Sequence, residues 1–181
     1  MPVVKAIDWN GSRLIRDFIS DYSVYPELTK KLDAHNWTFD DSIINEIVLW
    51  KLGRFVKIPT PSLTDLDGLK TLKPGQHKLA QKTLTQLLDC KGVRLPMAST
   101  YLRFANPEVF QIYDRHICRA LYGKFKSVAP KKPSEAAGIY WEFLDELIKQ
   151  CGRMQIPFKD ADRILFEFDK QVNPPLKGNE D

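Results

Sequence analysis

The chain has 181 residues, of which 43% are apolar and 11% aromatic, which is enough to form a hydrophobic core. Its formal net charge of +4 is too small to indicate a partner by itself. Apolar runs are short and interrupted by charges, so we expect no membrane span, which needs roughly 20 apolar residues. Residues 1–9 lack the features of a secretory signal, and we therefore expect a cytoplasmic protein.

The positions of cysteine and histidine do not indicate a metal site. Cys90, Cys118 and Cys151 are widely separated, whereas zinc and iron–sulfur sites use clustered ligands. Three scattered cysteines also argue against a disulfide framework. Neither a glycine-rich nucleotide loop nor a Ser/His/Asp arrangement at motif spacing is present. We therefore expect no metal and no cofactor.

Apolar residues recur at helical spacing along the chain, and the alternation of a half-buried strand is almost absent. The pattern predicts an all-α fold, a compact multi-helix domain over residues 1–172. The predicted helices span residues 12–22, 26–35, 40–52, 62–69, 76–90, 96–104, 114–122, 134–151 and 160–172. Residues 173–181 contain two prolines and end in acids, which predicts a disordered tail.

Several residues mark the predicted helix ends. Asp40 or Asp41 is a candidate N-cap, and Pro96 suits the first turn of a helix. Two prolines near the end of residues 53–61 disfavour helix there, so we predict a loop over this range. Asp160 and Asp162 are predicted to cap the last helix and to complement its dipole.

The charge is distributed unevenly. Residues 1–90 sum to +1, residues 91–132 to +7 and residues 133–181 to −4. A basic segment of this kind is a candidate phosphate-binding surface, and the alternative is an ordinary solvated face. Its basic residues are Lys91, Arg94, Arg103, Arg115, Arg119, Lys124, Lys126, Lys131 and Lys132.

Two segments of this region form a recognisable pattern. The first, Cys90-Lys91-Gly92-Val93-Arg94 followed by Leu95-Pro96-Met97-Ala98, has the layout of two helices joined by a tight hairpin. Such a hairpin presents backbone N–H groups beside a helix N-terminus, where they can hold a DNA phosphate. The second segment is Tyr113-Asp114-Arg115-His116. We place the helix-hairpin-helix at about 76–105 and the region of the motif aspartate at 109–123.

These segments resemble the helix-hairpin-helix DNA glycosylase superfamily, which includes endonuclease III, adenine glycosylase and the alkylpurine glycosylases. The family hairpin reads Leu-Pro-Gly-Val-Gly, followed by two variable residues, a small residue and Ala. An aspartate follows downstream, commonly within Val-Asp-Thr-His. The resemblance covers residues 76–123 and implies a glycosylase-like helical fold, DNA as the partner and a role in DNA repair.

Departures from the family pattern restrict the chemistry. Arg94 replaces the second hairpin glycine, so the phosphate contact is either looser or made by the arginine itself. Pro96 occupies the position of the lysine that is catalytic in the lyase branch, which excludes Schiff-base chemistry from that position. The family's four-cysteine iron–sulfur loop is missing. The resemblance thus implies, if the protein is an enzyme, a monofunctional hydrolytic N-glycosylase without lyase activity.

The resemblance also supplies candidate site residues. It implies that Asp114 stabilises the sugar cation or orients a water after a base is flipped out, and the alternative is that Asp114 only caps a helix. His116 is a candidate phosphate ligand or a packing residue. The candidate DNA-binding residues are Lys91, Gly92, Val93, Arg94, Ser99, Arg115 and His116. The aromatic residues assigned to the core rather than to a base pocket are Trp37, Trp50, Tyr140 and Trp141.

Two functions stay open at this point. One is a DNA-binding base-excision glycosylase. The other is a catalytically inert relative that acts as a DNA-binding or protein-interaction module, because a shared fold does not determine a function. The base recognised, the choice between DNA and RNA, and the oligomeric state are not predicted.

Overall fold

The computed structural model describes residues 5–7, 25–52, 56, 58–124 and 132–176, and within these ranges it contains helices and no strand. The prediction of an all-α fold is confirmed, while the helix predicted over residues 12–22 lies outside the described residues. The α-helices are α2 (Pro26–Asp33), α3 (Asp41–Lys51), α4 (Thr60–Gly68), α5 (Gln81–Asp89), α6 (Leu95–Ala105), α7 (Arg115–Tyr122), α8 (Pro133–Met154) and α9 (Ala161–Val172). Short 3-10 helices are η1 (Leu69–Thr71), η2 (His77–Ala80) and η3 (Phe158–Asp160).

Some helices begin at an aspartate that accepts a backbone N–H of the first turn, and others carry a proline in that turn. Asp40 accepts the Ile43 N–H at 2.9 Å and caps α3, as predicted. Both α6 and α8 carry a proline in their first turn, where a missing N–H removes no intrahelical bond.

Several predictions about helix ends differ from the structure. Helix α4 begins at Thr60, inside the range 53–61 that was predicted to be a loop. Pro61 lies in the first turn of this helix, where proline is favoured. The predicted helix over 76–90 is divided into η2 and α5. Asp160 makes no side-chain cap bond, and Asp162 is buried in an ion pair, so the predicted capping role of both is wrong.

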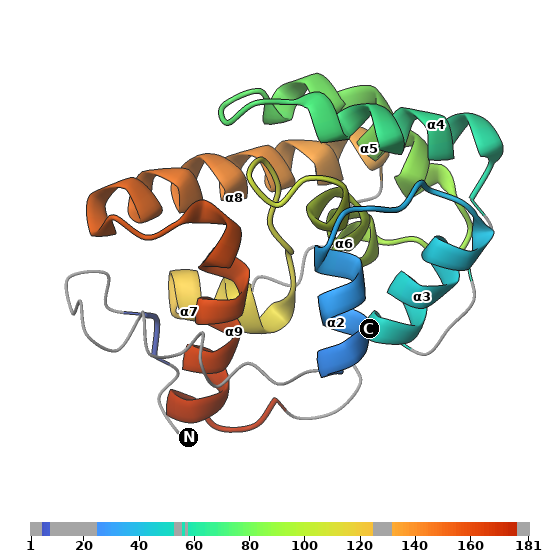
Figure 1. The fold of residues 1–181 in the computed structure, drawn as a ribbon. Helices are drawn as coiled ribbons and strands as arrows, with labels where there is room; N and C mark the ends of the chain where they lie inside the picture. Colours follow the sequence, from blue (N-terminus) through green and yellow to red (C-terminus); the bar gives the residue numbers. More distant parts are fainter. Residues whose placement is uncertain (1–4, 8–24, 53–55, 57, 125–131, 177–181) are drawn as a thin grey trace.

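Helix α6 lies in the centre of the molecule, with α8 beside it, α5 along α8, and α7 packed side by side with α9 (Figure 1). Every residue of α6 except Pro96 is buried, as expected for a helix that is largely apolar around its whole circumference. Tyr101 and Phe104 of α6 and Tyr140 and Phe143 of α8 are among the largest fully buried side chains. Burial of each of the two phenylalanine side chains stabilises the fold by roughly 1.5–3 kcal/mol.

Buried ion pairs join the helices. Arg103 of α6 donates from Nε to Asp162 at 3.0 Å and from Nη1 to Asp33 at 2.7 Å, which links α6 to α9 and α2. Its side chain is 3% exposed. Arg103 therefore belongs to the core and not to the predicted phosphate-binding surface.

The segment after α9 is also held in place. Asn173 is buried and donates to the Lys5 carbonyl at 2.6 Å and to Asp169 at 2.8 Å. The predicted disordered tail therefore does not begin at Asn173, and residues 177–181 lie outside the described part of the chain. No helix within the described ranges is both long and apolar enough to cross a membrane.

Candidate functional site

The turn between α5 and α6 lies where the sequence places the hairpin. The Val93 N–H donates to the Cys90 carbonyl at 3.0 Å and closes the turn. Gly92 has φ +87°, a left-handed conformation that glycine adopts without the steric cost of a Cβ. Lys91, Gly92 and Arg94 are exposed. These three residues are accessible to a phosphate.

Val93 does not fit its predicted role. Its side chain is buried and its N–H is already bonded within the turn, so it is a core anchor of the hairpin rather than a DNA contact. The Val93 N–H is bonded within the turn, whereas the start of α6 lacks a side-chain cap, because Arg94 at the N-cap makes no such bond. The first-turn N–H groups of a helix without such a cap are available to water or to an anion.

Ser99 also differs from the prediction. It is fully buried, and its hydroxyl donates to the Pro96 carbonyl and accepts the Tyr113 N–H, both at 2.9 Å. A DNA contact by Ser99 is therefore wrong. Its bond instead fixes the residue before Asp114 against the first turn of α6, and thus connects the two motif segments that the sequence could relate only by spacing.

Asp114 begins α7. Its Oδ1 accepts the Ile117 N–H at 2.9 Å, and its Oδ2 lies 3.0 Å from Lys51 Nζ. The side chains of Asp114 and Lys51 are 13% and 16% exposed. Burial raises the pKa of Asp114, but Lys51 and the helix N–H outweigh it and hold the pKa below its usual value. Asp114 is therefore a helix cap and also an ionised, largely buried carboxylate.

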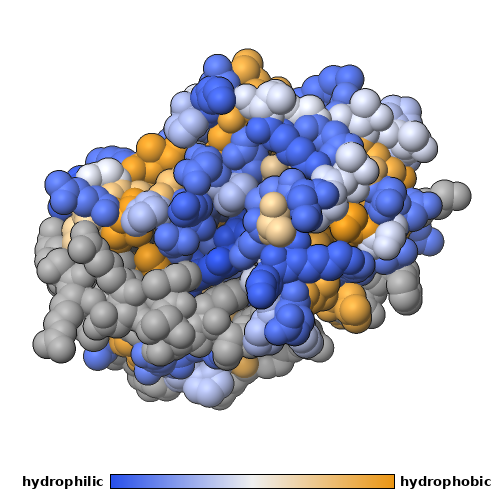
Figure 2. Space-filling view, in the orientation of Figure 1, coloured by the Kyte–Doolittle hydropathy of each residue, from blue (hydrophilic) through white to orange (hydrophobic). Residues whose placement is uncertain are grey.

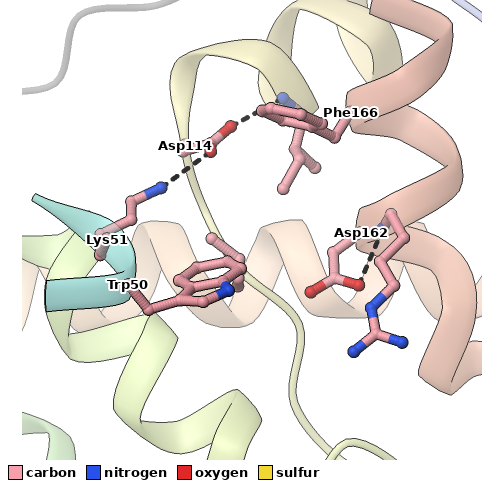
Figure 3. Close-up of a pocket in the computed structure, with 8 residues that line it drawn as sticks. Trp50, Lys51, Asp114, Asp162 and Phe166 are labelled. Atoms are coloured by element: carbon pink, nitrogen blue, oxygen red, sulfur yellow. Dashed lines mark hydrogen bonds and ion pairs between the residues drawn. The ribbon is translucent and has the colours of Figure 1, made fainter. Parts of the chain in front are cut away.

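Asp114 and Lys51 form part of the wall of a cavity of about 120 Å³ (Figure 3). The lining residues are Trp50, Lys51, Ile112, Asp114, Ile117, Asp162, Arg163 and Phe166. Ligand pockets commonly measure roughly 300 Å³ or more. The cavity is thus small for a ligand pocket.

The polar groups of this cavity differ in their capacity for chemistry. The two oxygens of Asp162 accept from Arg103 Nε and from the Arg163 N–H, so this carboxylate is committed to the fold. In Asp114, Oδ1 accepts the Ile117 N–H and Oδ2 is paired with Lys51, the last residue of α3. An ionised carboxylate in such a wall stabilises positive charge that develops nearby.

Sequence reasoning missed Lys51. It lies 63 positions before Asp114 and belongs to no motif, so no signal in the sequence brings the two together. Trp50 is buried, as predicted for the core, but it also lines the cavity. Its indole N–H donates to Thr29 at 2.6 Å, which fixes the ring.

Arg115 and His116 lie in a second hollow, a groove of about 490 Å³ beside α9. His116 Nδ1 is 2.7 Å from Asp169, and its ring contacts Phe166 with 5.0 Å between the centroids. The His116 side chain is 29% exposed. His116 thus has the packing role that the sequence left open, and it also keeps one edge toward the groove.

Within the described ranges, no three His, Cys, Asp or Glu side chains come together in a way that could hold a metal ion. Compared with known proteins, the chain matches no protein-family model, no curated protein and no solved structure.

Proposed function

We propose that this protein binds DNA through the hairpin between α5 and α6, in the manner of a helix-hairpin-helix DNA glycosylase, and that Asp114 assists hydrolytic release of a base. The observation that carries the proposal is the position of Asp114 in the cavity wall. The Ser99–Tyr113 hydrogen bond ties this carboxylate to the helix that follows the hairpin. One element would thus hold a phosphate while its neighbour presents the carboxylate to the sugar.

Binding would rest on the exposed groups of the hairpin. Lys91 and Arg94 supply positive charge, and Gly92 lets the backbone approach a phosphate without an intervening Cβ. Phosphate contacts of this kind release counterions, so affinity falls steeply as salt rises. Among the described residues on the face seen in Figure 2, hydrophilic side chains are interspersed with apolar ones.

The proposed reaction breaks the bond between the sugar C1′ and the base nitrogen, and the bonding electrons leave with the base. Asp114 stabilises the cation that develops on the sugar, and Lys51 keeps the carboxylate ionised. A water then adds to C1′, and the proton that it gives up passes to the departing base, which leaves as a neutral molecule. Because Pro96 has no amine, that position forms no covalent intermediate, and the product is an abasic site in an intact strand.

A second candidate function has its own support. Both oxygens of Asp114 already have partners, and the cavity is small. These features favour a relative that has lost catalysis and serves as a DNA-binding or protein-interaction module. The two candidates predict the same DNA binding and differ in base release.

The test compares Asp114→Asn with Asp40→Asn, a matched control that caps α3 through the same kind of bond outside the cavity. Release of bases from duplexes that carry damaged or mismatched bases is measured together with DNA affinity. An active glycosylase loses most of its turnover in Asp114→Asn alone, while DNA binding is retained. Base release that is equal in both variants contradicts the role of Asp114, and DNA binding without any base release supports the inert module.

A further inference from the structure

His35 lies in the loop between α2 and α3, residues 34–40, with a backbone that few residues adopt. Its φ is +51°, a left-handed conformation that is uncommon outside glycine. The ring stacks on Trp37, with 5.8 Å between the centroids and 27° between the planes. Lys70, which is paired with Asp67 at 2.8 Å, lies with its ammonium 4.8 Å from the centroid of the Trp37 ring. A left-handed backbone persists where surrounding contacts hold it, and the stacking on Trp37 is one such contact.

One ring nitrogen of His35 is buried without a partner. Nε2 is inaccessible to solvent and has no hydrogen-bond partner within the described part of the chain. A neutral imidazole can carry its proton on Nδ1 and leave Nε2 as an acceptor without a hydrogen. The protonated ring carries a hydrogen on both nitrogens, so it would place an unpaired N–H donor in this buried position, which is costly. The observed position of the ring therefore suits the neutral form.

Charged side chains from four elements act on the ring. Burial is the largest influence and lowers the pKa of His35. Arg103 of α6, Lys70 of η1 and Arg163 of α9 lower the pKa further, whereas Asp33 at the end of α2 raises it. The result is a pKa below the usual value. His35 therefore stays neutral under conditions in which an exposed histidine already gains a proton.

Asp33 connects the surroundings of His35 to the rest of the fold. It accepts a hydrogen bond from Arg103 Nη1 at 2.7 Å and is also paired with Arg163. These two contacts tie the end of α2 to α6 and α9. A cationic His35 would compete with both arginines for the Asp33 carboxylate, because a carboxylate attracts each of the three cations.

We propose that His35 is a pH-sensitive switch: protonation removes its ring from the stack with Trp37 and loosens the tie that Asp33 makes from α2 to α6 and α9. The neutral ring keeps the loop between α2 and α3 closed. Arg163 also lines the Asp114 cavity, so the switch connects the pH to the wall of that cavity. The switch depends neither on DNA binding nor on base release.

The direction of the pKa shift sets the pH range of the switch. In the unfolded chain His35 has the usual pKa of about 6.5, and in the folded protein its pKa is lower. The stability that neutral His35 contributes is thus fully present above about pH 6.5 and is lost as the pH falls from there through the lowered pKa. This loss begins well above the usual aspartate pKa of about 3.9.

His35→Asn provides the test, because asparagine tolerates a left-handed backbone and does not titrate. The free energy of unfolding of the full-length protein is measured with denaturant from about pH 7.5 down to about pH 5. Per pH unit, the folding equilibrium constant of the wild type should fall by up to about tenfold more than that of His35→Asn, which is the limit for one proton. An equal pH dependence of the two proteins overturns the proposal.

Nuclear magnetic resonance provides a second measurement, which decides the matter if His35→Asn does not fold. In the wild type, the signal of the Trp37 indole N–H should shift with the same midpoint as the ring protons of His35, below about pH 6.5. The matched control is His77→Asn, which removes a buried histidine whose ring lies 5.8 Å from that of Trp141. This control should keep the Trp37 response. A midpoint at or above the usual value, or a Trp37 signal that ignores His35, contradicts the switch.

The loosening of α2 has its own readout. Hydrogen exchange of the α2 amides is compared between the wild type and His35→Asn at the same pH, so that the intrinsic dependence of exchange on pH cancels. Below the midpoint of His35, exchange should be faster in the wild type, because local opening exposes these amides. Equal exchange in both proteins would show that His35 titrates without loosening α2, and the switch would then be wrong.

Discussion

Lys51 Nζ lies 3.0 Å from Asp114 Oδ2 and joins the end of α3 to the beginning of α7. Both groups are largely buried, so removing one of them leaves the other charge without its partner, which costs more than breaking a surface ion pair worth about 0–1 kcal/mol. Lys51 also keeps Asp114 ionised, and Asp114 is the one motif residue to which we assign a chemical role. Substitutions at and around this pair can separate its structural role from its functional one.

Charge reversal in the hairpin should weaken DNA binding. Lys91→Glu with Arg94→Glu removes two exposed cations and adds two anions beside the start of α6. We expect the logarithm of affinity to depend less steeply on the logarithm of salt, by roughly one unit for each phosphate that the variant no longer binds. Fluorescence anisotropy at several salt concentrations measures the slope. Failure of the wild type to bind any duplex or single strand at low salt would end the nucleic-acid proposal.

Borohydride trapping on abasic DNA should give no covalent adduct. Pro96 has no amine, and the Lys51 ammonium is paired with Asp114 rather than presented as a free nucleophile. Gel electrophoresis of the reduced mixture checks this expectation. If an adduct forms, Lys51→Ala shows whether this amine is responsible, and an adduct that survives the substitution locates the chemistry at another amine.

Loss of the Ser99 hydroxyl should destabilise the connection between the motif segments. In Ser99→Ala the buried Tyr113 N–H loses its acceptor, which costs about 1–3 kcal/mol. Thr100→Val is the matched control, because Thr100 is equally buried and also donates to the Pro96 carbonyl, at 2.8 Å. Denaturant unfolding should show the larger loss for Ser99→Ala, and equal losses would mean that the bond to Tyr113 contributes nothing.

Acid should unfold the protein partly through Asp114 and Asp169. Both have a folded-state pKa below the usual value, so the stability they contribute is fully present above the ordinary aspartate pKa of about 3.9. It is lost as the pH falls from there through the lowered pKa values. Unfolding free energy measured against pH should therefore decrease less steeply below about pH 4 in Asp114→Asn than in Asp40→Asn. Identical slopes would show that Asp114 titrates normally.

Stability at neutral pH gives a further check on Asp114. Asparagine caps a helix about as well as aspartate, so the loss of the cap alone costs little. The structure adds the Lys51 ammonium, which in Asp114→Asn stays largely buried without its counter-charge. We expect a loss of about 1–3 kcal/mol, and Lys51→Met in the same background should restore part of it. The absence of any recovery would show that the pair is not the source of the loss.

The helices were predictable because their signals are local. Spacing of apolar residues, an aspartate at a cap and a proline in a first turn each act within a few residues, as at Asp40 and Pro96. The contacts across the fold were not predictable. Ser99 directly follows the hairpin segment, yet its burial depends on the packing of α6, and only the fold brings Lys51 to Asp114.

The same limit applies to the charges. Summing the charges over residues 91–132 placed Arg103 and Arg119 in a basic surface. In the structure their partners are Asp162 and Asp169, which belong to the acidic last segment of the chain. Ion pairs between distant segments cannot be read from composition. What the sequence does indicate correctly in this region is the turn at Gly92 and the cap at Asp114, both of which depend on neighbouring residues alone.

Phe166 contributes one ring to two hollows, the Asp114 cavity and the groove beside α9. A ligand that displaced this ring from one hollow would change the shape available in the other. Any coupling that arose in this way would be reciprocal, because each ligand would change the affinity for the other by the same factor. The position of Phe166 therefore makes it the side chain through which the two hollows would communicate.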